Sequence, residues 1–144
     1  MTAGENNLTK ELLNEIMNSR ELTDFLENNK ERFIHMSLSK YLLKLIHEKN
    51  IPISEIIQHT TIEKSYMYQI LNGRRNPSRN KLLQMVIAMG LDIEETQNLL
   101  KIGNMGILYA KAPRDVAIIY SIKNKYSLIQ TQVVLEEFGF ELLD

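Results

Sequence analysis

A short bend near the middle of the chain collects side chains that bind anions. Residues 72–79 read NGRRNPSR and lie between two apolar patterns with helical spacing. Guanidinium groups form charge-assisted hydrogen bonds with phosphate, and amide and hydroxyl groups can donate to phosphate oxygens without adding charge. A helix that begins near Ser78 would add free backbone N–H groups and a partial positive charge. The bend therefore predicts contact with a phosphate backbone; the alternative is a solvated loop between two helices.

The charge is distributed unevenly along the chain, although the net charge is only −1. Residues 37–81 contain 8 Lys and Arg against 3 Asp and Glu, whereas residues 1–36 contain 4 against 7 and residues 82–144 contain 5 against 8. A basic middle between acidic flanks indicates an anionic partner for the middle alone. Chance clustering of solvated charge is the alternative interpretation.

The sequence offers little for catalysis or metal binding. The chain has no Cys, so disulfides and thiolate metal sites are impossible. His35, His47 and His59 are far apart and lack further ligands at metal-binding spacing. Adjacent acids at 94–95 and 136–137 point to different helix faces, and no nucleophile, Gly-rich phosphate loop or catalytic triad accompanies them. We therefore expect no enzyme activity, no cofactor and no metal.

The sequence also predicts a cytoplasmic protein. The first residues lack a basic start followed by an apolar run, so no signal peptide is expected. The longest apolar runs are only a few residues, too short to cross a membrane. The absence of Cys fits a reducing compartment.

The spacing of apolar residues predicts an all-α protein, because alternating strand patterns are scarce and helical spacing recurs throughout. The expected helices cover residues 10–17, 19–33, 40–50, 53–59, 63–71, 79–89, 92–102, 114–124 and 128–138. Side chains that can cap helices precede four of them: Thr9, Ser37 or Ser39, Ser78 and Asp92. Glycines are expected to end four: Gly73, Gly90, Gly103 and Gly139.

Two of these helices, 53–59 and 63–71, are short and joined by a tight turn, which is typical of a helix-turn-helix. The expected inward residues are Ile56, Ile57, Ile62, Met67 and Ile70. The outward face of the second helix is polar or amphipathic. It contains residues of the kinds that contact base edges and phosphates in the major groove: Glu63, Lys64, Ser65, Tyr66 and Gln69.

The stretch PISEIIQHTTIEKSYMYQILNGRRNPSRNKLLQMVIAMGLDIEE resembles the helix-turn-helix domain of the phage repressor and Cro class, also called the xenobiotic-response-element family. Its most specific part is ILNGRRNPS, which is similar to the family pattern hydrophobic-x-x-Gly-x-Arg-x-Pro-Ser. The resemblance implies a five-helix DNA-binding domain at residues 37–103. An N-terminal helical extension, 1–36, would precede it, and a C-terminal helical hairpin, 104–144, would follow.

The resemblance implies a bacterial or phage transcriptional regulator that binds double-stranded DNA in a sequence-specific way. Helix 63–71 would enter the major groove, with base readers at Lys64, Ser65 and Gln69. Tyr66 would stack, touch phosphate or fill the core. The bend would bind the phosphate backbone through Asn72, Arg74, Arg75, Asn76, Ser78 and Arg79. Most such regulators bind as dimers across half-sites about one DNA turn apart.

Three positions depart from the family pattern. Ile53 stands where a Gln often contacts DNA, Ile57 where a small residue is usual, and Thr61 where Gly is usual. An alternative function is therefore a protein-interaction module that keeps the fold but has lost or weakened DNA binding. It would act like an antitoxin or bind a toxin or kinase partner through its terminal helices. Those helices could instead pack on the domain or on a second subunit.

Arg114 and Asp115 follow Pro113 at the expected start of a helix. Asp115 there would favour the helix dipole. We expect Arg114 to pair with Asp115 or with another acidic neighbour. A contact with a partner protein is the functional alternative.

Overall fold

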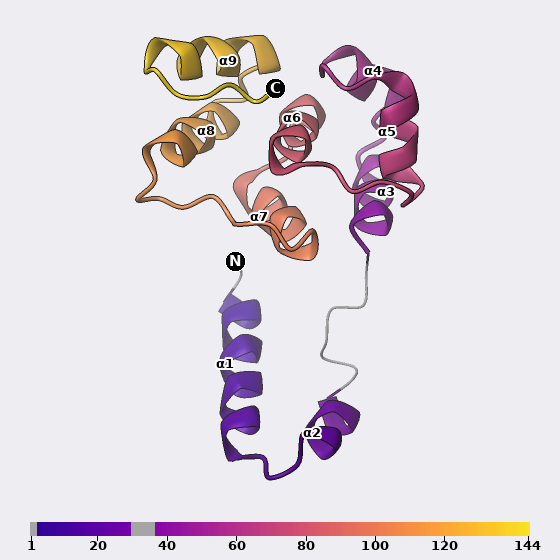
Figure 1. Cartoon of the computed structure of the whole chain (residues 1–144), viewed down its shortest axis with the longest axis vertical. Coiled ribbons are helices and arrows are strands. Elements are labelled where there is room, and N and C mark those ends of the chain that lie inside the picture. The colour runs from indigo at the N-terminus through magenta and orange to yellow at the C-terminus, as the bar shows by residue number, and fades with distance from the viewer. Residues whose placement is uncertain (1–2, 30–36) are drawn as a thin grey trace. The chain divides into compact units, whose positions relative to one another are not determined.

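The computed structural model describes residues 3–29 and 37–144, and every regular element in these residues is a helix, which confirms the all-α prediction (Figure 1). The helices are α1 (Ala3–Asn18), α2 (Leu22–Asn29), α3 (Leu38–Glu48), α4 (Ile53–Gln58), α5 (Lys64–Leu71), α6 (Arg79–Met89), α7 (Ile93–Ile102), α8 (Pro113–Lys123) and α9 (Leu128–Glu137).

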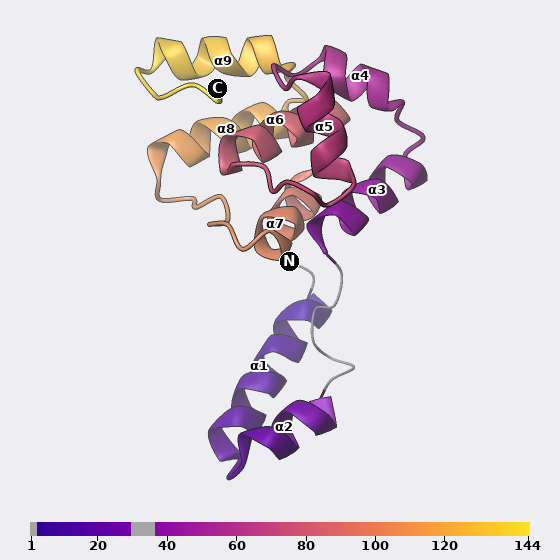
Figure 2. The ribbon, with the colours of Figure 1, turned by 45° about the vertical axis from the view of Figure 1, so that its right-hand side comes forward.

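The chain divides once, into compact units at residues 1–35 and 36–144. The first unit contains α1 and α2, and the second contains α3 to α9. The expected five-helix domain, 37–103, and the expected C-terminal hairpin, 104–144, therefore lie in one compact unit. In that unit α8 packs on α7 and α9 packs on α6 (Figure 2). The terminal hairpin thus packs on the domain, one of the two arrangements that the sequence left open.

Local sequence signals set most of the helix ends. The Oγ atoms of Ser37 and Ser78 accept hydrogen bonds from the N–H groups of Lys40 and Lys81. Asp92 caps α7 in a capping box with Glu95, which satisfies two backbone donors at once. Ser37, rather than Ser39, is therefore the cap of α3, and the caps expected at Ser78 and Asp92 are confirmed.

Glycines end helices as expected where the backbone turns left-handed. Gly73 has φ +81° after α5, and Gly90 has φ +66° after α6. These conformations favour glycine because it has no Cβ. Thr9 does not cap a helix, because α1 begins at Ala3 and contains it. The expected helix 19–33 begins later, at Leu22, and is helical through Asn29; residues 30–33 lie outside the described residues.

One apolar core connects all the helices of the second unit. Fully buried side chains come from every one of them and from the tail after α9: Leu42, Ile56, Met67, Leu82, Leu99, Ile118, Leu135 and Leu143. Burying a side chain of this size contributes about 1.5–3 kcal/mol. The α4–α5 segment therefore depends on the same core as α8, α9 and the tail.

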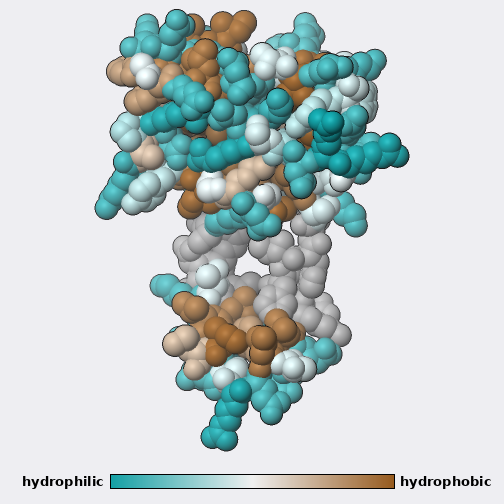
Figure 3. Space-filling model, viewed as in Figure 1, coloured by the Kyte–Doolittle hydropathy of each residue, from teal (hydrophilic) through white to brown (hydrophobic). Residues whose placement is uncertain are grey.

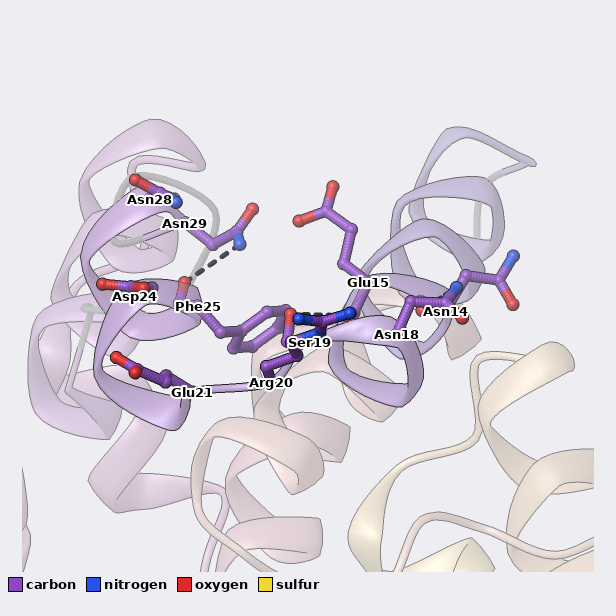
Figure 4. Close-up of a pocket in the computed structure, with 10 residues that line it drawn as sticks. All are labelled: Asn14, Glu15, Asn18, Ser19, Arg20, Glu21, Asp24, Phe25, Asn28 and Asn29. Carbon is purple, nitrogen blue, oxygen red and sulfur yellow. Dashed lines mark hydrogen bonds between the residues drawn. The ribbon is translucent and has the colours of Figure 1, made fainter.

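The first unit is a helical hairpin with little buried apolar surface. Phe25 is buried, and Figure 4 shows its ring directed from α2 toward α1. The buried Asn29 side chain donates to the Phe25 carbonyl at 3.0 Å. Large apolar side chains remain exposed on both helices, Met17 at 77% among them, and they contribute to the hydrophobic surface that Figure 3 shows on this unit.

Candidate nucleic-acid interface

The short helices α4 and α5 are joined by residues 59–63. Ile56, Ile62, Met67 and Ile70 are buried in the core, as the apolar pattern predicted. Ile57 is only half-buried and packs against the core from the side. The buried set fixes which face of α5 remains at the surface.

Lys64 and Ser65 lie on the exposed surface of α5, while Gln69 is half-buried. The Ser65 hydroxyl donates to the carboxylate of Glu63 at 3.0 Å. Among the described residues, the Lys64 ammonium has no ion pair. The first turn of α5 therefore presents a free cation beside a hydroxyl, and Gln69 follows about one turn later.

The basic bend lies at the other end of α5. Asn72, Arg74, Arg75, Asn76 and Ser78 are all exposed. The backbone N–H groups of Arg74 and Arg75 both donate to the Gln69 carbonyl, at 2.9 Å and 3.1 Å. The Asn72 side chain accepts a further bond from the Arg74 N–H at 3.0 Å. These bonds hold the bend against the C-terminal turn of α5, where cations are favoured by the helix dipole.

Tyr66 connects the bend to the next helix. Its half-buried ring faces the Arg75 guanidinium carbon at 5.0 Å and the Lys81 ammonium at 5.1 Å from the ring centre. Cation–π contacts of this kind hold a cation by the negative face of the ring. Lys81 was not among the expected site residues. It could have been predicted from the sequence, because it lies three residues after the cap Ser78 and therefore in the first turn of α6, next to the bend.

Arg79 has a structural role that differs from the expected phosphate contact. Its Nε donates to the Gly106 carbonyl at 2.9 Å, and one terminal nitrogen donates to the Ile107 carbonyl at 3.2 Å. Both terminal nitrogens also donate to the Asp115 carboxylate, at 3.3 Å and 3.1 Å. Four of the guanidinium's five N–H groups are thereby used. The placement of Arg79 among phosphate ligands is therefore corrected.

The pairing expected for Arg114 is also wrong. Its guanidinium donates to the carbonyls of Glu141 and Leu142, at 2.8 Å and 3.0 Å, and to the Asn80 side chain at 3.0 Å. Asp115 pairs with Arg79 instead and accepts a bond from the Tyr109 N–H at 3.0 Å. Arg114 thus anchors the tail to α6 and α8.

The turn between α4 and α5 is held by a buried amide that the sequence reading missed. Gln84 is 1% exposed, and its Oε1 accepts from both the N–H and the hydroxyl of Thr61, at 2.9 Å and 3.0 Å. Its Nε2 donates to the Leu143 carbonyl at 2.6 Å. A Gln inside the apolar run LLQMVIAM was the available signal, because buried amides are nearly always hydrogen-bonded.

In the first unit, a hollow of about 390 Å³ is lined largely by amide and acidic side chains, and Arg20 also lines it (Figure 4). Among residues 3–29 and 37–144, His, Asp and Glu form no cluster of three that could hold a metal ion. The exposed cations of α5 and the bend, together with the half-buried Lys81 of α6, are therefore the strongest candidate for a functional surface.

The chain matches no protein-family model, and neither a curated protein nor a solved structure is significantly similar to it. Within the described residues, each helix is too short or too polar to cross a lipid bilayer.

Proposed function

We propose that residues 36–144 form a DNA-binding domain of the phage repressor and Cro class and that the protein is a sequence-specific transcriptional regulator. Helices α3 to α7 would be the five helices of that class, with α4 and α5 as the helix-turn-helix. The observation that carries the proposal is the cationic surface that the exposed Lys64, Arg74 and Arg75 and the half-buried Lys81 form around α5. We call these four residues the cationic surface.

The geometry of α5 suits the major groove. Its opposite face is buried through Met67 and Ile70, so Lys64, Ser65 and Gln69 are left to face a ligand. A major groove admits one helix, and Lys, Ser and Gln can hydrogen-bond base edges there. The bend after α5 would then lie over the sugar–phosphate backbone, where contacts position the protein without reading sequence.

The cationic surface sets the expected salt dependence. Each phosphate neutralised on duplex DNA contributes about −0.9 to the slope of log K against log salt concentration. With Arg79 committed to Asp115, four cations remain for each subunit. We therefore expect a slope of roughly −4 for each subunit bound.

Two departures from the family pattern have structural uses that do not require loss of DNA binding. Ile57 packs against the core, and Thr61 satisfies its N–H and hydroxyl on Gln84. The alternative, an interaction module that no longer binds DNA, gains support from another feature. The exposed apolar side chains of α1 and α2 suit a protein partner, including a second copy of the chain.

A selection from a random-sequence duplex library, followed by fluorescence anisotropy over a salt series, tests the proposal. Enrichment of one sequence and a slope of roughly −4 per subunit are expected. The double variant Arg74→Ala/Arg75→Ala should reduce the slope by about 2 for each subunit. The matched control is Lys111→Ala/Lys123→Ala, which removes equal charge from two exposed positions, one just before α8 and one at its last residue.

The proposal fails if no duplex is enriched at low salt. It also fails if the arginine pair and the lysine pair weaken binding equally, because binding would then depend on net charge alone. In either case, capture of a protein partner by the full chain would favour the interaction module.

A further inference from the structure

A groove of about 580 Å³ lies along α8, α9 and the start of the tail, at the end of the second unit where Figure 3 shows hydrophobic surface. Two aromatic pairs form much of its lining. The rings of Tyr120 and Tyr126 meet edge to face with centroids 5.8 Å apart, and those of Phe138 and Phe140 stack at 6.4 Å. A groove of this size and character fits one small organic molecule.

The groove contains a single charged lining residue, Glu137. Among the described residues, its carboxylate has no hydrogen-bond or ion-pair partner. Glu137 is also the last residue of α9, so its negative charge adds to the partial negative charge of a helix C-terminus. Aromatic faces attract cations as well. The electrostatics of the groove therefore favour a positively charged guest.

The tyrosine pair does not compete with this charge pattern. A hydrogen bond to Tyr120 and electrostatic repulsion from the Tyr120 oxygen raise the pKa of Tyr126 above its usual value. Tyr126 therefore stays neutral at physiological pH, and Glu137 remains the source of negative charge in the groove.

The groove is connected to the helix-turn-helix by the tail. Phe140 lines the groove, and two residues later the Leu142 carbonyl accepts from Arg114 at 3.0 Å. The Leu143 carbonyl then accepts from Gln84, whose other side-chain atom binds Thr61 in the turn. A guest that displaces Phe140 would pull on this chain of hydrogen bonds.

We propose that the groove binds an organic cation with an aromatic or aliphatic body, and that its occupation loosens the tail and the α4–α5 turn. The proposal that a cation binds depends only on the structure of the groove. The consequence for DNA rests on the proposed function. A bound cation would then lower DNA affinity.

Binding is tested by calorimetric titration of the full chain with tetraphenylphosphonium, and with triphenylphosphine oxide as an uncharged analogue. Tetraphenylphosphonium should bind at least about fivefold more tightly than the oxide, because its positive charge is attracted to the Glu137 carboxylate and to the aromatic ring faces. Glu137→Gln should weaken tetraphenylphosphonium about three- to tenfold and leave the oxide unchanged. Glu136→Gln is the matched control, because Glu136 is exposed but does not line the groove.

Coupling is tested on the same protein by two readouts. Tetraphenylphosphonium should accelerate hydrogen exchange of the Thr61 N–H and weaken binding to the selected duplex about fivefold or more. Both effects should disappear in Glu137→Gln. If the protein binds no duplex, the exchange of Thr61 still decides the coupling, so failure of the proposed function and failure of this inference are distinguishable.

Three results would overturn the inference. The first is equal or absent binding of the two probes. The second is equal loss in Glu137→Gln and Glu136→Gln. The third is a sedimentation experiment in which Phe138→Ala converts a dimer to a monomer, because the groove would then belong to a second copy of the chain.

Discussion

Arg79 and Asp115 form a two-pronged ion pair across 36 positions of sequence, with nitrogen–oxygen distances of 3.3 Å and 3.1 Å. The pair joins the first residue of α6 to the first turn of α8. It therefore ties the proposed DNA-binding helices to the terminal hairpin, rather than offering a cation to DNA.

Replacing Arg79 should reduce the stability of the folded protein more than it reduces DNA affinity. Arg79→Ala leaves the largely buried Asp115 carboxylate with fewer hydrogen-bond donors. We expect the free energy of unfolding to fall by about 2–3 kcal/mol. This loss is smaller than for a fully buried pair, because Arg79 is partly exposed. Urea denaturation measures it. Arg74→Ala is the control and should stay within about 0.5 kcal/mol of the parent. Equal stability of the two variants would contradict a structural role for Arg79.

Gln84→Leu should destabilise the α4–α5 turn. The substitution keeps similar size but removes the acceptor of the Thr61 N–H and the donor to the Leu143 carbonyl. Unsatisfied groups of this kind cost about 1–3 kcal/mol. We expect that loss by urea denaturation, together with faster hydrogen exchange at Thr61. Gln58→Leu, at an exposed position on α4, should change neither.

Leu143→Ala tests whether the tail belongs to the core. Leu143 is 0% exposed, and truncating a buried leucine costs about 2–5 kcal/mol. Leu43→Ala, at 42% exposure on α3, is the matched control and should cost less than about 1 kcal/mol. Thermal melting of both variants decides the question. Similar melting temperatures of the two variants would mean that Leu143 is not buried in the core.

Tyr66→Leu should weaken DNA binding without unfolding the protein. Leucine retains apolar contact with the core but provides no ring face for Arg75 and Lys81. Exposed cation–π contacts are worth about 0.5–1 kcal/mol each, so losing both should lower duplex affinity by no more than roughly five- to thirtyfold. Tyr68→Leu on the exposed side of α5 should have a smaller effect. Unchanged affinity in Tyr66→Leu would show that the ring does not position these cations for DNA.

The features that the sequence predicted correctly depend on near neighbours in the chain. Ser78 and Asp92 were recognisable as caps because each binds an N–H three residues later. The apolar spacing likewise identified Met67 and Ile70 as inward residues, because the helical period alone determines which side chains face the core. The helices and their ends were therefore largely predictable.

The features that the sequence did not predict depend on distant partners. Asp115 is 36 residues from Arg79, and Arg114 is 34 residues from Asn80. No local rule chooses between such partners, because several acids and amides compete for each arginine. The assignment of Arg79 to phosphate followed from its neighbours in the bend, and only the packing of α8 on the unit reveals its actual partner.

The bond from Gln84 to the Leu143 carbonyl spans 59 positions, and it bears on the order of folding. Helical proteins usually fold quickly because their contacts are local, whereas closing a long loop costs entropy before any contact compensates for it. Docking of the final residues should therefore be the slow, closing event of the second unit. Until it occurs, the turn between α4 and α5 would lack the tail contact that holds Gln84 in place, so this turn should reach its final structure last.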